Sequence, residues 1–154
     1  MAVTESTCVY IVRDGKWLML YRNAKKNDVN HGKWIGIGGK REGNETFEEC
    51  AIREVKEETG FSVSSLQYEG EVCFYQNEIC TEYIRVYMVR ECEGTEIQCD
   101  EGTLSWIEEK KVLSLPLWEG DRIFLKRMMQ NEHLPFSLSL YYDTCNTLVN
   151  VKEG

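Results

Sequence analysis

Three glutamates within one turn of a predicted helix are the residues best suited to chemistry. Glu54, Glu57 and Glu58 stand at positions i, i+3 and i+4, so a helix projects their carboxylates from one face. Like charges at this spacing repel one another. The group is therefore either a solvated acidic face, relieved by Arg53 and Lys56, or a site for a hard divalent cation that prefers oxygen ligands. Spacing alone does not decide between these two interpretations.

The helix that carries these carboxylates has clear start and stop signals. Thr46 followed by Glu49 forms the pattern of a capping box, in which each side chain accepts a hydrogen bond from the other's amide. Gly60 suits the left-handed residue that ends a helix. The sequence therefore predicts a helix from about Phe47 to Thr59. Its buried stripe comprises Phe47, Cys50, Ala51 and Val55.

A polar, glycine-rich segment from Tyr21 to Lys40 precedes this helix. Its glycines leave backbone amides and carbonyls free to approach a ligand. We therefore predict a loop that forms part of a site. The glycines are Gly32, Gly36, Gly38 and Gly39.

Short strands and one further helix complete the predicted α/β architecture. Asp14-Gly15 suits a tight turn and predicts a hairpin of strands 8–12 and 17–21. A second amphipathic helix is predicted over 119–130. Further strands are predicted over 67–76, 81–91, 102–109 and 135–143.

Composition limits the functional classes. The 154 residues fit a single domain spanning 1–154. A formal charge of −8 disfavours binding to a nucleic-acid polymer, which requires clustered cations. No stretch approaches the roughly 20 apolar residues of a membrane span, and no secretory signal is evident.

Seven cysteines form no CxxC pair, so we expect buried thiols in the reducing cytoplasm, and not a zinc or redox centre.

The whole acidic stretch resembles the signature of the Nudix hydrolases. Gly39 is followed after five residues by Glu45, and after seven more by the run Arg53-Glu54-Val55-Lys56-Glu57-Glu58-Thr59-Gly60-Phe61. The family usually has Glu-Gly-Glu before the helix, where this chain has Glu42-Gly43-Asn44-Glu45. The segments "GKW" and "LPLWEGD" further resemble the MutT-type branch that hydrolyses oxidised purine nucleoside triphosphates.

The resemblance implies a fold and a reaction. The fold is an α/β/α sandwich with a mixed central sheet. The reaction is an attack of water on a nucleoside triphosphate, dependent on Mg²⁺ or Mn²⁺, that yields the monophosphate and pyrophosphate. The metal ligands implied are Glu54, Glu57, Glu58 and the carbonyl of Gly38, with Arg53 orienting the carboxylates and Glu45 supporting the helix end.

Three residues outside the helix are weaker candidates by the same resemblance. Glu101 aligns with an acidic residue that several family members bring to the metal as a base, although it could equally lie on a solvated turn. Arg22 and Lys40 stand where cations contact the triphosphate, and each could instead be a surface charge.

Base recognition is implied at the start of the second predicted helix. Trp118 would stack on the base and Asp121 would bond its edge, while a core role for Trp118 is the alternative. Glu119 is a possible substitute for a second acid of the relatives. At the position of Ile35 the relatives have an Asn that reads the base, so this chain departs from them there. Oxidised guanine stays a plausible substrate despite this departure.

The predicted partner is thus a small-molecule nucleotide, with no nucleic-acid polymer and no membrane. Two alternatives to hydrolysis of oxidised triphosphates stay open. One is hydrolysis of ADP-ribose, another nucleoside diphosphate derivative or an RNA 5′ end. The other is a module that senses a nucleotide without cleaving it, although the intact carboxylate group argues against this. The sequence carries no signal for an oligomeric state.

Overall fold

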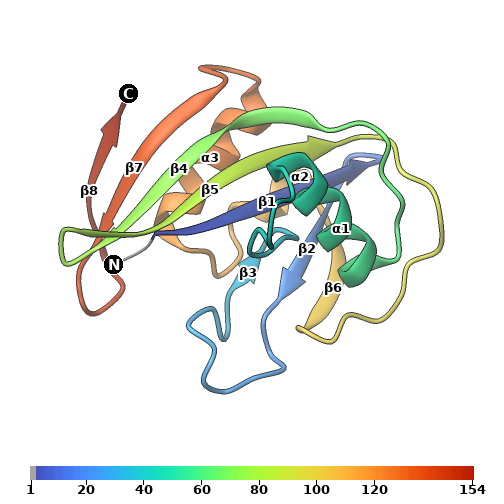
Figure 1. Cartoon of the computed structure of the whole chain (residues 1–154), viewed down its shortest axis with the longest axis horizontal. Coiled ribbons are helices and arrows are strands. Elements are labelled where there is room, and N and C mark those ends of the chain that lie inside the picture. The colour runs from blue at the N-terminus through green and yellow to red at the C-terminus, as the bar shows by residue number, and fades with distance from the viewer. Residues whose placement is uncertain (1–2) are drawn as a thin grey trace.

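A mixed β-sheet with helices on both faces makes up the structure, a computed structural model that describes residues 3–154 (Figure 1). The helices are α1 (Phe47–Thr59), α2 (Glu109–Val112) and α3 (Glu119–Gln130). The strands are β1 (Thr4–Arg13), β2 (Lys16–Tyr21), β3 (Trp34–Ile35), β4 (Gln67–Gln76), β5 (Ile79–Val89), β6 (Thr103–Glu108), β7 (Phe136–Tyr142) and β8 (Leu148–Glu153).

The strand order explains why the sheet is mixed. The strands follow one another as β3-β2-β1-β5-β4-β7-β8, and β6 pairs with β2. The pairs β1/β5 and β4/β7 are parallel, whereas the other neighbours are antiparallel. The predicted α/β/α sandwich with a mixed central sheet is confirmed.

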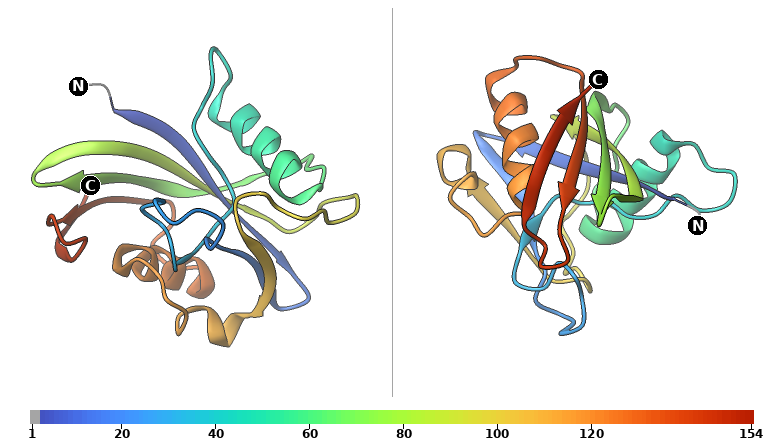
Figure 2. Two further views of the ribbon diagram at one scale, coloured as in Figure 1. Left: turned by 90° about the horizontal axis from the view of Figure 1, so that it is seen from below. Right: turned by 90° about the vertical axis from the view of Figure 1, so that its left-hand side faces the viewer.

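Alternation along β1 divides the core into two layers. Val9 and Ile11 belong to the layer beneath α1, and Tyr10 between them belongs to the layer beneath α3. All three side chains are fully buried, because a strand directs successive side chains to opposite faces of the sheet. Figure 2 shows α1 and α3 on opposite sides of the sheet.

The local signals read from the sequence produce the expected geometry. Asp14 and Gly15 adopt φ angles of 52° and 74° in the turn between β1 and β2. The capping box of Thr46 and Glu49 is formed in both directions, and Gly60 ends α1 with a φ of 85°. The predicted bounds of α1 and α3 are confirmed.

Three elements were not predicted: β3, α2 and β8. The first two are too short to show a periodic pattern. In β8 only Leu148 is partly buried and the rest is exposed, so the alternation that reveals a half-buried strand is missing. In addition, β5 begins at Ile79 and ends at Val89, two residues earlier at each end than predicted.

Candidate active site

The glycine-rich segment that precedes α1 runs beside β1. Thr7 donates its amide to the carbonyl of Gly39 at 3.0 Å, and Ile37 exchanges backbone hydrogen bonds with Val9. Successive residues of an extended chain direct their amides to opposite sides. Gly38, which lies between these two pairs, therefore directs its backbone groups away from β1.

Gly38 and Gly39 bring the backbone close to α1. The Gly38 amide donates to Oε2 of Glu58 at 3.0 Å. A Cβ atom at Gly39 would lie 2.6 Å from Oε1 of Glu54, and one at Gly38 would overlap the carbonyl of Thr7. Any side chain is thus excluded at both glycines, and two carboxylates share a confined space with bare backbone.

Arg53 is the cation that organises the acidic face. Its guanidinium donates to both carboxylate oxygens of Glu45 at 3.0 and 2.8 Å, and to the Lys40 carbonyl at 3.1 Å. It also contacts Glu54 at 2.9 Å and Glu57 at 3.2 Å. These bonds lower the pKa of Glu45 to about 2. The contacts match the orienting role predicted for Arg53 and the supporting role predicted for Glu45, and both roles stay predictions.

Glu58 is the most deeply buried of the three candidate ligands. Its pKa is raised to about 8, chiefly by burial and also by the charges of Glu54 and Glu101, against the hydrogen bond from Gly38. Burial also raises the pKa of Glu54, against the contact with Arg53. Negative charge on this face is therefore only partly compensated by the protein.

Arg22 and Glu101, two separate candidates from the sequence, form an ion pair with each other, and their roles stay predictions. Arg22 forms an ion pair with Asp28 at 2.6 Å and with Glu101 at 3.3 Å. Glu101 comes from the loop between β5 and β6, and its charge raises the pKa of Glu58. The loop thus adds a fourth acidic group to the three carboxylates of α1, and Arg22, which pairs with it, lines the cavity.

The donors in this region suit a divalent cation. They are carboxylate oxygens of Glu54, Glu57 and Glu58 together with the Gly38 carbonyl, and hard cations prefer oxygen. Within residues 3–154 no three acidic, His or Cys side chains already converge as a metal cluster. Arg53 contacts two of the carboxylates instead, and the side chain of Glu57 is 59% exposed. The ligand set stays a prediction.

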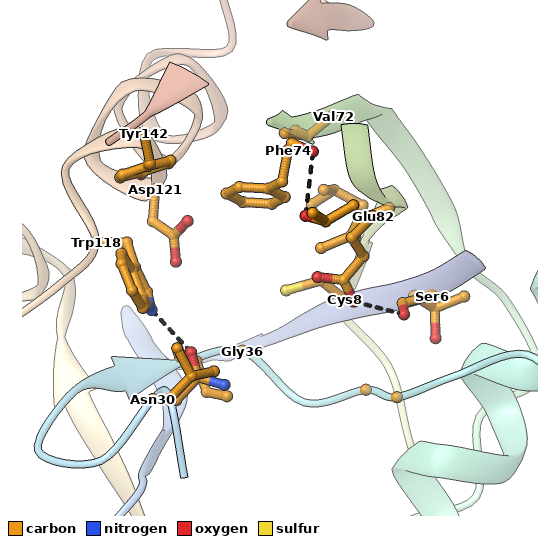
Figure 3. Close-up of a pocket in the computed structure, with 18 of the residues that line it drawn as sticks. Ser6, Cys8, Asn30, Gly36, Val72, Phe74, Glu82, Trp118, Asp121 and Tyr142 are labelled. Carbon is orange, nitrogen blue, oxygen red and sulfur yellow. Dashed lines mark hydrogen bonds between the residues drawn. The ribbon is translucent and has the colours of Figure 1, made fainter. Parts of the chain in front are cut away.

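A cavity of about 450 Å³ opens beside this face, and Figure 3 shows its interior. Gly38, Gly39 and Lys40 line one end of it, whereas Trp118 and Asp121 line the other. This volume lies in the range of small-molecule sites. The glycine segment before α1 and the predicted base-binding residues thus line one cavity.

Trp118 is held at the cavity wall from three sides. Its indole N–H donates to Oδ1 of Asn30 at 2.8 Å. The ring meets that of Tyr142 edge to face, with centroids 5.4 Å apart. The Lys33 ammonium lies 5.0 Å from the indole centroid. These contacts fix the orientation of a flat apolar surface that lines the cavity.

Two carboxyl groups, one buried and one half-buried, face the cavity from different elements. Asp121 lies on α3, and burial raises its pKa to about 7, with the charge of Glu82 adding to the shift and that of Lys33 opposing it. Glu82 lies on β5 and accepts a hydrogen bond from the Ser6 hydroxyl at 2.7 Å. The pKa of Glu82 is also raised by burial.

The remaining predicted residues differ in position. Ile35 lines the cavity, whereas Glu119 is absent from its lining and instead pairs with Arg122 at 3.2 Å. Sequence reasoning missed Asn30 and Glu82. A signal existed for Glu82. It stands two residues before Ile84, on a strand face that is otherwise apolar, where an acid is unexpected. No comparable signal marked Asn30, which lies in an irregular loop.

Comparison with protein families decides the family. A family model described as "NUDIX domain" matches residues 3–128, most of the chain. The chain belongs to the Nudix family. Its α1, with the glycine segment before it, carries the Nudix signature that the sequence displays.

Named relatives and solved structures agree with this assignment. The chain is 30% identical to an "Oxidized purine nucleoside triphosphate hydrolase" of Danio rerio, over 82% of this chain and 80% of the relative. It is 29% identical to the "CTP pyrophosphohydrolase" of Escherichia coli, over 84% and 93%. A crystal structure of a MutT protein from Bacillus halodurans superimposes with a TM-score of 0.83 at 25% identity, over 98% and 97%.

Membership fixes the enzyme class of this chain as a Nudix hydrolase. Nudix hydrolases act on small nucleotide substrates and generally use divalent metal ions. The oxygen donors of Glu54, Glu58 and Gly38 are consistent with that general chemistry. Within residues 3–154, no helix combines the length and apolar character needed to span a bilayer.

Proposed function

We propose that this Nudix hydrolase is a Mg²⁺-dependent nucleoside triphosphate pyrophosphohydrolase whose substrates are oxidised purine nucleotides such as 8-oxo-dGTP. The products would be the monophosphate and pyrophosphate, and the role would be sanitation of the cytoplasmic nucleotide pool. The observation that carries the proposal is the shared cavity. It joins Gly38, Gly39 and Lys40 at one end to Trp118 and Asp121 at the other.

The glycine end suits a triphosphate. Lys40 and Arg22 supply positive charge at the cavity wall, and Gly39 exposes backbone where a side chain would collide with Glu54. Phosphoryl transfer depends mainly on positioning and on stabilising charge. Cations beside a carboxylate face fit this requirement, because the acids alone would repel the substrate.

Glu54, Glu57, Glu58 and the Gly38 carbonyl would hold the divalent cation. When bound, such a cation offsets phosphate charge and lowers the pKa of coordinated water. Arg53 would keep Glu54 and Glu57 oriented through the hydrogen bonds described above.

Glu101 would accept the proton of the attacking water. It is partly exposed and lies on a loop, so it can approach a substrate without disturbing the core. Its pairing with Arg22 positions the carboxylate near the phosphate end.

Trp118 and Asp121 support a purine at the other end. The indole presents a rigid face for stacking, and base stacking on an aromatic ring contributes about 1–3 kcal/mol. Asp121, whose pKa lies near 7, is available both to accept and to donate a hydrogen bond at neutral pH. A flat face and a carboxyl group together fit a base with polar edges.

A release assay over a nucleotide panel tests the proposal. The panel contains 8-oxo-dGTP, dGTP, CTP and ADP-ribose, and CTP is included because of the activity named for the Escherichia coli relative. We expect 8-oxo-dGTP to give the highest kcat/KM, with pyrophosphate as product. Excess chelator should abolish turnover, and Mg²⁺ or Mn²⁺ should restore it. A higher kcat/KM for CTP or ADP-ribose would overturn the substrate assignment.

A further inference from the structure

Glu82 is an acid on a strand face that is otherwise apolar. It shares its face of β5 with Ile84 and Val86, which line the same cavity. Carboxylates on such faces are rare unless they are paired or hydrogen-bonded, because burial without compensation is costly. The family signature does not account for Glu82, which lies far from it in sequence.

One oxygen of Glu82 is fixed and the other is available. Oε2 accepts from the Ser6 hydroxyl at 2.7 Å. Within residues 3–154, Oε1 accepts no hydrogen bond and Glu82 forms no ion pair. The Ser6 bond therefore orients the carboxylate and leaves Oε1 for a ligand (Figure 3).

Glu82 and Asp121 approach the cavity from opposite sides, as Figure 3 shows. Charged neighbours shift the pKa of both groups. The charge of Glu82 raises the pKa of Asp121, and the charge of Lys40 lowers that of Glu82. Ser6, whose hydroxyl donates to Glu82, also pairs with Lys40 through an antiparallel backbone β-bridge. Glu82 thus lies toward the phosphate end of the cavity and Asp121 toward the far end.

A purine nucleotide with its phosphates at the glycine end of this cavity can lie in only one direction along it. The sugar and phosphates extend from the five-membered ring, so the edge with N7 and C8 lies closer to the phosphate end than the Watson–Crick edge does. N7 of guanine is an acceptor. In 8-oxoguanine, N7 carries a hydrogen and becomes a donor.

We propose that Glu82 is a specificity-determining residue that accepts a hydrogen bond from N7–H of an 8-oxopurine, while Asp121 takes the opposite edge. This inference rests on the proposed function. A carboxylate facing N7–H gains a charge-assisted hydrogen bond. Facing the N7 lone pair of an ordinary purine, the same group meets another acceptor, so the unoxidised base is rejected.

The test compares kcat/KM for 8-oxo-dGTP and dGTP in wild type and Glu82→Gln. An amide can donate to the N7 lone pair, so the preference for 8-oxo-dGTP should fall by about tenfold to a hundredfold, with dGTP hydrolysis kept or increased. Ser6→Ala removes the orienting hydroxyl and should shift the preference in the same direction by less. Glu78→Gln is the matched control, because Glu78 is exposed in the β4–β5 turn and loses the same charge.

The outcomes separate this inference from the function it rests on. A wild-type preference that persists unchanged in Glu82→Gln overturns the role of Glu82 alone. An equal loss for both nucleotides points to a sugar contact and also overturns it. A wild type without preference overturns both the role and the proposed substrate. Binding of 8-oxo-dGMP and dGMP, measured by thermal shift on the same proteins, gives the preference again if Glu82→Gln turns over too slowly, and it reports folding.

Discussion

The acidic face of α1 beside the cavity and the base end of the cavity differ in how they hold carboxyl groups. At the α1 end, Arg53 contacts Glu45, Glu54 and Glu57 directly. At the base end, within the described chain, neither Asp121 nor Glu82 has an ion-pair partner. At the α1 end a guanidinium contacts the acids directly, and burial nevertheless raises the pKa of Glu58. At the base end, again within residues 3–154, no cation forms an ion pair with the acids, and burial raises the pKa of Asp121 to about 7.

The proposed function gives this difference a reason. Carboxylates that coordinate a metal must be ionised, and a cation nearby favours that state. A carboxyl group that reads a base edge gains from exclusion of water, because an unsatisfied partner is then costly. We infer that the α1 end sets the rate of hydrolysis and the base end sets the choice of nucleotide.

The largest effect should come from the α1 end. Glu58→Gln should lower kcat by orders of magnitude for every nucleotide, because a charged ligand for the cation is lost. In metal-free buffer at neutral pH the same variant should be as stable as wild type or more so, since the folded state no longer has to keep a buried carboxyl group protonated beside Glu54. Steady-state kinetics and urea unfolding measure the two effects.

Glu132→Gln is the control for this prediction, because Glu132 is exposed beyond the end of α3 and loses the same charge. It should leave both kcat and stability unchanged. A Glu58→Gln variant that is strongly destabilised yet fully active would assign Glu58 a structural role, and the contrast between the two ends would disappear.

A smaller effect should appear at the base end as a dependence of stability on pH. The pKa of Asp121 is about 7 in the folded chain and ordinarily 3.8, so the folded state holds a proton that the unfolded state releases. Stability contributed by this group is therefore full below about pH 4 and falls until about pH 7. Asp121→Asn lacks this loss, so its unfolding free energy relative to wild type should rise by roughly 4 kcal/mol between pH 4 and pH 7.

Urea unfolding of both proteins from pH 4 to pH 8 without metal measures that difference. Glu82, Lys33 and Tyr142 are present in both proteins, so most of their own titration cancels in the comparison. A difference that stays constant across the range would show that Asp121 is ionised throughout, which would contradict the buried, unpaired state assigned to it.

The two ends also differ in how far the sequence predicted them. The α1 end is contiguous: a capping residue, a glycine pair and acids at helical spacing determine it locally, so Thr46, Gly39 and Glu58 could be read directly. The sandwich fold followed from the same stretch through its resemblance to a family. One contiguous stretch thus predicted both the residues of the α1 end and the fold.

The base end is assembled from distant segments. Asn30 meets Trp118 across 88 positions and Ser6 meets Glu82 across 76. Such contacts depend on strand register and order, which a single sequence does not specify. Trp118 and Asp121 were predicted through the resemblance, whereas Glu82 required the parallel pairing of β1 with β5 to place it beside Ser6.

The most direct measurement of the central claim is a competition between 8-oxo-dGTP and dGTP in one reaction as Mg²⁺ is lowered from saturation to excess chelator. The account predicts that both rates fall together to zero while their ratio, in favour of 8-oxo-dGTP, stays constant, because metal and base are held at separate ends. A ratio that drifts toward one as Mg²⁺ falls, or hydrolysis that survives in excess chelator, would contradict it.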